Sequence, residues 1–157
     1  MKKEIAIDSS LLVGLIYPDD NWHSRSITLW KAIKTSRHLS VFFDCVAAEA
    51  TSAAIRRLHE KKRPSSEIEN LFNQLNTYVS PDNITWILPD VPRLYPETIK
   101  LMQSSGGALN FNDALIALAC RERSIPAIAS FDTDFDQIEW LHRLAMPEDM
   151  SGLFENE

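Results

Sequence analysis

The sequence contains few cysteines and histidines, and none of them is arranged as a metal-binding motif. It has 2 cysteines and 4 histidines among 157 residues. Cys45 and Cys120 lie in apolar stretches without a Cys-x-x-Cys spacing, and the histidines form no His-x-His or His-Glu-x-x-His pattern. We therefore expect two buried free thiols in a reducing compartment and no zinc site.

Basic residues are also in short supply. The chain has 16 Lys and Arg against 22 Asp and Glu, which gives a formal net charge of −6. Proteins that bind nucleic acids normally carry an excess of positive charge to contact phosphates. Either the partner is not a nucleic acid, or the surplus carboxylates are concentrated in a site that holds cations.

No secretion signal, repeat or linker is evident. A basic start precedes an apolar run over residues 5–17, but Asp8 and the two serines after it interrupt that run, and no small-residue cleavage site follows. The hydrophobic content of 45% suits one compact domain over residues 1–157, because a chain of this length can bury roughly two thirds of its unfolded surface. We expect a cytoplasmic protein without a membrane partner.

Strand and helix signals alternate along the chain, which predicts a layered α/β fold with a mainly parallel central sheet. The predicted strands cover residues 4–7, 39–43, 83–87, 126–130 and 142–146. The predicted helices cover residues 9–17, 21–35, 44–62, 64–79, 92–105 and 113–123. We expect Asp44 to be the N-cap of the third helix, and either Asn110 or Asn112 to cap the last one.

Four acids stand out by their places along the chain. Asp8 directly follows the first predicted strand, and Asp132 follows the fourth. Asp113 lies in the first turn of the last helix, and Glu49 lies one turn inside the third helix, among alanines that permit close packing. Each acid alone could be a helix cap or a first-turn residue favoured by the helix dipole. Because the carboxyl ends of parallel strands line one crevice, we expect the four to converge there.

Carboxylates that converge in this way repel one another. A pair about 5 Å apart costs on the order of 3 kcal/mol at an effective dielectric constant near 20. Such a cluster persists only if it binds cations or takes up protons. Hard divalent ions prefer oxygen ligands, and they can support hydrolysis of a phosphodiester. A cation site would also reconcile the acidic composition with a nucleic-acid substrate.

Four segments resemble the motifs of PIN-domain nucleases, in the order in which that family carries them, and together they span nearly the whole chain. The segments are Ile-Ala-Ile-Asp8-Ser9-Ser10-Leu-Leu, Val46-Ala-Ala-Glu49-Ala-Thr, Leu109-Asn-Phe-Asn-Asp113-Ala-Leu-Ile-Ala and Ile128-Ala-Ser130-Phe-Asp132-Thr-Asp134-Phe. The resemblance implies a three-layer, Rossmann-like PIN domain with helices on both sides of the sheet. It also implies a divalent-metal-dependent endoribonuclease that uses Mg²⁺ or Mn²⁺.

The same resemblance implies roles for individual residues and partners. Asp8, Glu49, Asp113 and Asp132 would be the catalytic acids and metal ligands, with Asp134 as an auxiliary ligand. Ser9 and Ser130 would be hydroxyl residues that support the metal, and Ser10 stands where Asn is also common. Many small members are toxins of toxin–antitoxin pairs (VapC type), which implies an RNA substrate, an antitoxin protein and a homodimer.

One segment of the chain is concentrated in positive charge. It contains Arg56, Arg57, Lys61 and Lys62 near the end of the third predicted helix. These residues could complement the helix dipole, or they could guide RNA phosphates toward the acidic site. The four tryptophans could likewise be core and interface residues or platforms for nucleic-acid bases.

Three other functions compete with the ribonuclease interpretation. Haloacid-dehalogenase-like phosphatases carry Asp-x-Asp after the first strand, but Ser10 stands at the second position. Receiver domains have an acid pair in the first crevice loop and a Lys after the last strand, and neither is evident. A PIN-fold RNA-processing or RNA-binding module without strong cleavage activity is the remaining alternative, which metal binding without cleavage would support.

Overall fold

The computed structural model describes residues 2–153. In this part of the chain, five strands form one sheet in the order β3-β2-β1-β4-β5, and every neighbouring pair is parallel. The strands are β1 (Glu4–Ile7), β2 (Leu39–Phe43), β3 (Ile84–Thr85), β4 (Ala127–Ala129) and β5 (His142–Leu144). The predicted α/β class with a mainly parallel sheet is confirmed.

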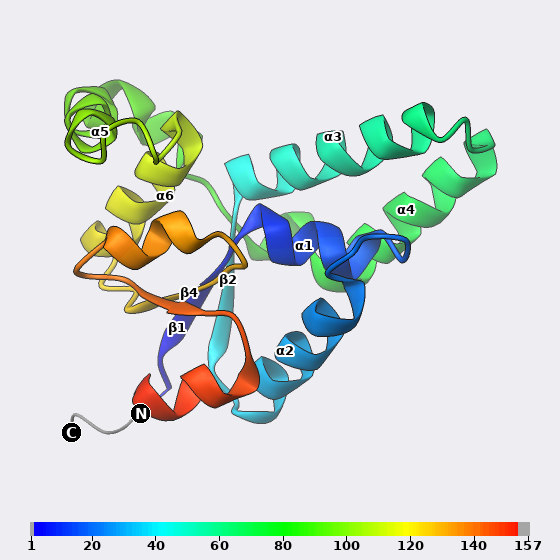
Figure 1. The fold of residues 1–157 in the computed structure, drawn as a ribbon, viewed down its shortest axis with the longest axis horizontal. Coiled ribbons are helices and arrows are strands. Elements are labelled where there is room, and N and C mark those ends of the chain that lie inside the picture. The colour runs from blue at the N-terminus through cyan, green and yellow to red at the C-terminus, as the bar shows by residue number, and fades with distance from the viewer. Residues whose placement is uncertain (1, 154–157) are drawn as a thin grey trace.

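Helices cover both faces of the sheet (Figure 1). They are α1 (Ser9–Ile16), α2 (His23–Thr35), α3 (Asp44–Glu60), α4 (Ser65–Tyr78), α5 (Val91–Ser104) and α6 (Phe111–Glu122). Short 3₁₀ turns are η1 (Pro81–Asn83), η2 (Leu88–Asp90), η3 (Thr133–Gln137) and η4 (Pro147–Leu153). Helices α1 to α4 lie on one side of the sheet and α5 and α6 on the other, while α3 and α4 extend together as an arm.

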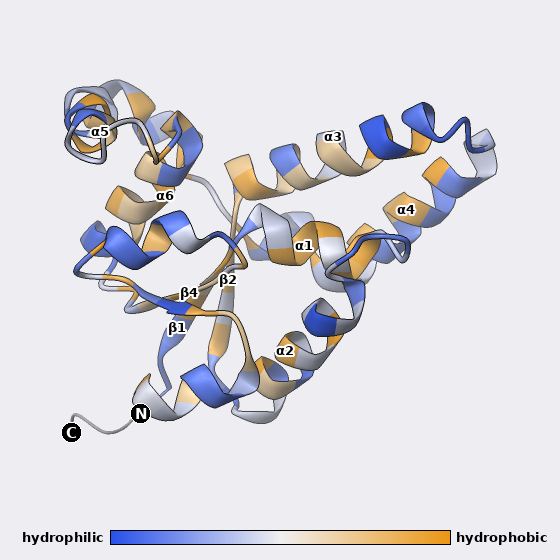
Figure 2. Cartoon of the chain, viewed as in Figure 1, coloured by the Kyte–Doolittle hydropathy of each residue, from blue (hydrophilic) through white to orange (hydrophobic). Residues whose placement is uncertain are grey.

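The central strands are buried on both faces. Ile5, Ala6 and Ile7 of β1 have no exposed surface, and the three residues of β4 are equally buried. Continuous apolar runs of this kind are typical of parallel strands that helices cover from both sides. Figure 2 shows apolar residues concentrated in the strands and α1, with hydrophilic residues toward the free end of the arm. The buried apolar runs define where β1 and β4 end. They therefore also fix the positions of the residues that directly follow these two strands.

The prediction that Asp44 caps α3 is wrong. Phe43 is the N-cap residue, and Asp44 is the first residue of the helix. Its buried carboxylate accepts hydrogen bonds from the backbone N–H groups of Ile87 (3.1 Å) and Leu88 (3.0 Å). Those N–H groups are therefore not available to a strand ladder, which explains why β3 contains only Ile84 and Thr85 rather than residues 83–87.

Asn110, rather than Asn112, caps α6. Its side-chain oxygen accepts a hydrogen bond of 2.8 Å from the backbone N–H of Asp113. The helix therefore begins at Phe111, two residues earlier than expected, and carries Asp113 in its first turn. Gly106 and Gly107 have φ values of 63° and 80°, a left-handed conformation that glycine adopts readily, and they turn the chain from α5 toward α6.

The packing of α1 on α2 leaves no room for a side chain at Gly14. A Cβ built there would overlap Ser26 Oγ and lie 2.8 Å from Ser26 Cβ. We expect Gly14→Ala to lower the free energy of unfolding by about 1–3 kcal/mol, because overpacking outweighs the better helix propensity of Ala. Urea denaturation measures the loss. Gly152→Ala is the matched control, because its nearest contact would lie 3.8 Å away.

A second substitution checks the cause of this loss. Ser26→Ala in the Gly14→Ala background removes the overlapping oxygen but retains the Cβ at 2.8 Å, so it should restore part of the lost stability. An additive effect of the two substitutions would contradict the steric explanation.

Within residues 2–153, none of the helices combines the length and the apolar composition that a membrane crossing requires.

Candidate active site

The four acids singled out in the sequence line one pocket at the carboxyl edge of the sheet. The pocket has a volume of about 260 Å³, and Asp8, Glu49, Asp113 and Asp132 are among its lining residues. They come from four separate segments of the chain: the end of β1, the second turn of α3, the first turn of α6 and the turn after β4. The structure thus brings together the four acids that the sequence singled out.

Asp8 is the most enclosed of these acids. Only 4% of its surface is exposed, and its backbone N–H donates to the carbonyl of Ala129 at 3.0 Å, so the ladder between β1 and β4 continues to this residue. Asp132 follows β4, and its Oδ1 accepts a hydrogen bond from the backbone N–H of Asp134 at 2.9 Å. Two adjacent parallel strands therefore place Asp8 and Asp132 at the same edge of the sheet.

Two serine hydroxyls position Asp8. Ser130 Oγ donates to Asp8 Oδ2 at 2.6 Å, and Ser10 Oγ donates to the same oxygen at 2.9 Å. Ser130 Oγ in turn accepts from the N–H of Asp132 at 3.0 Å, and Ser10 Oγ accepts from the N–H of Phe131 at 3.1 Å. The network joins the turn after β1 to the turn after β4 and leaves Asp8 Oδ1 outside it.

Burial and neighbouring charges raise the pKa values of three of the four acids. Burial, together with the neighbouring charges of Asp8, Asp132 and Glu49, raises the pKa of Asp113 to about 7. Burial also raises the pKa of Asp8, although the bonds from the two serines oppose it. The pKa of Glu49 is raised by burial and by Asp8, while hydrogen bonds with Asn112 and Ser9 lower it. The mutual repulsion expected from the sequence is therefore present.

The pocket suits a hard divalent cation by its chemistry. Its donors are carboxylate and hydroxyl oxygens, the ligands that Mg²⁺ prefers, and a cation would relieve the repulsion among the buried acids. In the described part of the chain, however, no three His, Cys, Asp or Glu side chains already converge tightly enough to form a metal site. A cation would therefore have to draw the carboxylates together from their present conformations.

The structure places Ser9 and Asp134, the two other residues to which the resemblance gave roles at the metal, beside the acids. Ser9 lines the pocket, but the partner of its side chain is Glu49. Asp134 does not line the pocket, and its contact with the acids is the backbone N–H that bonds to Asp132. Ser9 therefore contacts one of the acids through its side chain, and Asp134 contacts another through its backbone N–H.

Sequence reasoning missed Asp20 at the rim of the pocket, and it did not single out Trp22 and Arg57 from the other tryptophans and basic residues. Asp20, Trp22 and Arg57 all line the pocket, and Arg57 forms a salt bridge with Asp20. The second oxygen of Asp20 accepts a hydrogen bond of 3.0 Å from the backbone N–H of Trp22. Asp20 follows Pro18 in a segment that we interpreted only as a helix stop, so no sequence signal separated it from an ordinary turn residue.

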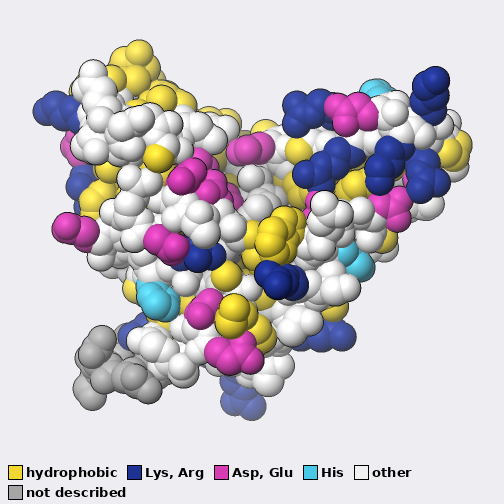
Figure 3. All heavy atoms as spheres, in the orientation of Figure 1, with side chains coloured by type: hydrophobic (Ala, Val, Ile, Leu, Met, Phe, Trp, Pro, Cys, Tyr) yellow, Lys and Arg dark blue, Asp and Glu magenta, His cyan; other side chains and the backbone are white. Residues whose placement is uncertain are grey.

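The basic segment of the sequence lies mainly on the free end of the arm. Arg56, Lys61 and Lys62 are exposed there, whereas Arg57 points to the pocket. Figure 3 shows Lys and Arg gathered over this arm and a hollow between the arm and the α5–α6 side of the molecule. Helix α3 therefore carries one acid of the pocket, Glu49, and leads to the basic surface at the free end of the arm.

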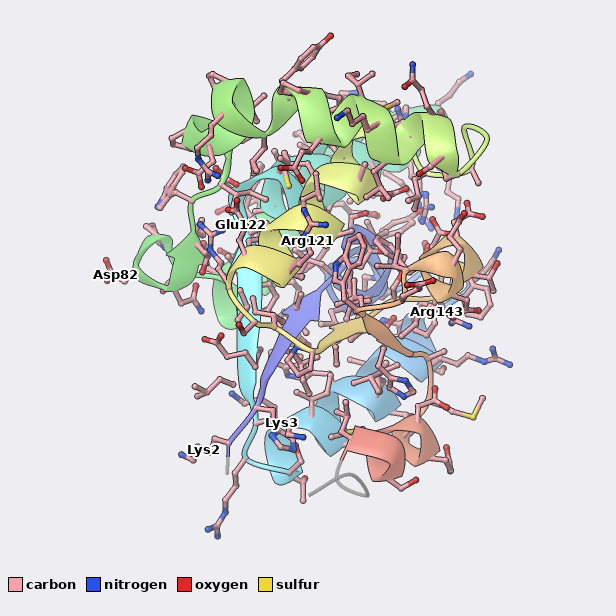
Figure 4. The ribbon with its side chains drawn as sticks, turned by 90° about the vertical axis from the view of Figure 1, so that its left-hand side faces the viewer. Lys2, Lys3, Asp82, Arg121, Glu122 and Arg143 are labelled. Atoms are coloured by element: carbon pink, nitrogen blue, oxygen red, sulfur yellow. The ribbon has the colours of Figure 1, made fainter. Side chains whose placement is uncertain are left out.

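The opposite side of the molecule carries cations that are already paired. Figure 4 shows Arg121 and Glu122 on α6 and Arg143 on β5. Arg121 pairs with a carboxylate of Glu97 at 2.5 Å, and Glu122 pairs with Arg93 at 2.6 Å. Arg143 donates to both carboxylate oxygens of Asp136, from Nε at 2.7 Å and from Nη2 at 3.0 Å. This side offers less free positive charge to phosphates than the arm does.

Two other features do not form a competing site. A hollow of about 620 Å³ lies between the end of α1, α3 and α4, but its acids, Asp19 and Glu67, both pair with Arg63. The two thiols are free and buried, as expected, and burial raises the pKa of each to about 12. Neither cysteine is therefore a nucleophile at neutral pH.

Comparison with known proteins identifies the family. A model of the PIN domain matches residues 5–141. The chain belongs to the PIN domain family. Among solved structures, VapC20 of Mycobacterium tuberculosis, described as a sarcin–ricin-loop-cleaving toxin, matches with a TM-score of 0.64 and 17% identity, over 87% of this chain and 95% of that chain. At this identity the likeness shows a shared PIN fold. A comparison with curated proteins gave no match.

Proposed function

We propose that this PIN domain is an endoribonuclease that depends on Mg²⁺ or Mn²⁺. The observation that carries the proposal is the convergence of Asp8, Glu49, Asp113 and Asp132 in one pocket, where burial and neighbouring carboxylates raise the pKa values of the first three. Membership of the PIN domain family supports a nuclease. The oxygen-only donor set supports a hard divalent ion rather than zinc.

Each residue of the pocket has its own role in the proposed hydrolysis. Asp8, Asp113 and Asp132 would hold the divalent ion, and Glu49, which lies on α3, would hold a second ion or orient the attacking water. When bound, such an ion neutralises charge on the scissile phosphate and makes a nearby water more acidic. Ser10 and Ser130 keep Asp8 oriented, as partners of ligating carboxylates do. The oxygen of water bonds to phosphorus, and the bond to the 3′ oxygen breaks as that oxygen takes up a proton.

A toxin of the VapC type is the biological role we propose. The fold shared with VapC20 supports this role. It implies an antitoxin protein that covers the acidic pocket, a homodimer and a cytoplasmic location. The open pocket at the foot of the arm is a surface on which such a partner could insert an Arg side chain among the carboxylates.

One observation favours the alternative of a PIN-fold RNA-binding module with weak or no cleavage. Among residues 2–153, the acids do not stand close enough to form a metal site without moving. If they fail to converge on a cation, the chain would bind RNA without cutting it. Cleavage therefore has to be measured rather than assumed from the fold.

The deciding experiment is cleavage of a structured RNA pool by the purified protein in Mg²⁺, in Mn²⁺ and in EDTA. We expect cleavage with either metal, none with EDTA, and products that carry 5′-phosphate and 3′-hydroxyl ends. Products with 2′,3′-cyclic phosphates would exclude the mechanism, because they require attack by the ribose hydroxyl. Metal binding and RNA binding without cleavage would establish the alternative.

The arm should contribute to RNA affinity through unpaired positive charge. Replacing Arg56, Lys61 and Lys62 with Ala should weaken RNA binding and reduce the slope of log Kd against log salt by about 2–3, because each lost phosphate contact removes nearly one unit. Filter binding at several salt concentrations measures both quantities. Arg57 is left in place because it pairs with Asp20 at the pocket.

A matched control uses charges on the paired side of the molecule. Arg93→Ala and Arg121→Ala remove cations that already have carboxylate partners, so the salt dependence should change little. If the arm variant binds RNA with the affinity and salt slope of the wild type, the arm is not an RNA-binding surface.

A further inference from the structure

An exposed tryptophan stands at the rim of the acidic pocket. Trp22 lines the pocket with the four acids, yet 41% of its surface is exposed to solvent. It lies between α1 and α2 and is the N-cap residue of α2. An indole that faces a charged pocket and remains this exposed is not accounted for by core packing.

The indole is held in a fixed orientation. Its ring stacks on Phe131 with a centroid distance of 4.9 Å and an angle of 12° between the planes. The backbone N–H of Trp22 donates to Asp20 Oδ2 at 3.0 Å, and Asp20 also pairs with Arg57. Phe131 directly precedes Asp132 in the chain. The aromatic pair is therefore built on the same turn that carries one of the four acids.

An arginine without a carboxylate partner lies beside the indole. The guanidinium of Arg25 is 5.0 Å from the centroid of the Trp22 ring, and within residues 2–153 no salt bridge engages it. A cation–π contact at an exposed site is weak, so a planar ligand can displace the guanidinium from the ring. Arg25 is thus free to contact an anion next to the indole.

Arg25 also lines a separate hollow. This hollow has a volume of about 360 Å³ and is further lined by the hydroxyl residues Ser24 and Thr28 of α2 and by residues 145–148, of which Glu148 is the one acid. Arginine and hydroxyl side chains are common donors to phosphate and ribose oxygens. A strand that leaves the acidic pocket past Trp22 would therefore reach groups suited to its backbone.

We propose that Trp22 and Arg25 form a nucleotide subsite beside the acidic pocket. An unpaired base of the RNA stacks on Trp22, and the phosphate attached to that nucleotide pairs with Arg25. The inference rests on the proposed ribonuclease function and deepens it, because it names the kind of RNA that the site takes. Only an unpaired base can be splayed out onto an aromatic ring. Trp22 is then a specificity-determining residue that directs cleavage to loops and single strands.

The test combines a protein variant with a missing base. RNA substrates carry one abasic nucleotide at each position around the mapped cleavage site, and kcat/KM is measured for wild type, Trp22→Ala and Trp22→Phe. At one position the abasic RNA should reduce the wild-type value roughly 5- to 100-fold, mainly through KM. Trp22→Ala should show a loss of the same size on intact RNA and no further loss at that position, while Trp22→Phe should retain most of the activity.

A second exposed tryptophan provides the matched control. Trp86 is 60% exposed and does not line the acidic pocket, so Trp86→Ala should cleave intact and abasic RNA as the wild type does. A general folding defect in Trp22→Ala would lower activity on every substrate equally. If Trp22→Ala cleaves intact RNA like the wild type, or remains sensitive to every abasic position, the subsite is overturned.

A binding experiment separates the subsite from the nuclease proposal. Single-stranded RNA with 2-aminopurine is titrated with the Asp113→Asn protein, which keeps the substrate intact. The fluorescence of 2-aminopurine should be quenched by the protein that retains Trp22 and not by the protein that also carries Trp22→Ala. Adding Arg25→Ala instead should weaken RNA binding and lower the salt dependence of binding. If Trp22 quenches the fluorescence but the wild type does not cleave RNA, the ribonuclease proposal is rejected and the subsite is retained. If the wild type cleaves RNA but Trp22 does not quench the fluorescence, the subsite is rejected and the ribonuclease proposal is retained.

Discussion

RNA cleavage in Mg²⁺ should fall at least about 100-fold when Asp113 is replaced by Asn. Asp113 is only 7% exposed and faces the charges of Asp8, Asp132 and Glu49. An amide has nearly the same shape but no charge, so it is a far weaker ligand for a divalent ion. Loss of a group that merely orients a ligand typically costs 10- to 100-fold, and loss of a ligand should cost at least the upper value.

The substitution should leave the fold intact, because the capping bond from Asn110 is made to the backbone N–H of residue 113. Activity is measured as kcat/KM on one RNA substrate with Mg²⁺, with circular dichroism to confirm folding. Asp82→Asn is the matched control, since Asp82 is an exposed acid in η1 (Figure 4) and does not line the pocket. Equal cleavage by wild type and Asp113→Asn would show that the activity resides elsewhere or in a contaminant.

In the absence of metal, the protein should lose stability as the pH rises from about 4 to about 7. The pKa of Asp113 is raised from 3.8 to about 7 in the folded state, so the folded state holds this proton more tightly than the unfolded chain does. Such a group contributes its full stability below the unfolded pKa and loses it as the pH passes through the folded pKa. The shift corresponds to an effect on the order of 4 kcal/mol.

Urea denaturation in EDTA at pH 5 and pH 8 measures this effect. The amide of Asp113→Asn does not titrate, so the stability that the variant gains relative to the wild type should be clearly larger at pH 8 than at pH 5. Mg²⁺ at pH 8 should then stabilise the wild type more than the variant, because the ion binds only the folded state. An identical pH dependence for the two proteins would contradict the raised pKa of Asp113.

The sequence predicted the main elements well because their signals are local. β1 and β2 have the bounds that apolar runs and their polar ends indicated, and the acids after β1 and β4 were placed by the general geometry of parallel sheets. β3 was predicted too long, because the carboxylate of Asp44 engages the backbone of Ile87 and Leu88 from a distant part of the chain. No pattern within residues 83–87 carries that information.

The same distinction applies to the site. The four acids carry motif spacing and could be predicted, whereas the partners that orient them depend on contacts across the fold. Ser10 acts on Asp8 together with Ser130, which is 120 residues away from Ser10 in the sequence. Trp22, at the rim of the pocket, stacks on Phe131, which directly precedes Asp132 in the chain. Side chains of this kind become visible only when the strands are placed side by side.

The two outermost strands are very short, with 2 residues in β3 and 3 in β5. A neighbouring molecule that tried to continue the sheet would find only a few backbone groups to pair with, which limits edge-to-edge aggregation. Two copies that associate would therefore have to meet mainly through surfaces other than these strand edges. Substitutions at the edges should then leave both the association of copies and the central strands that position Asp8 and Asp132 unchanged.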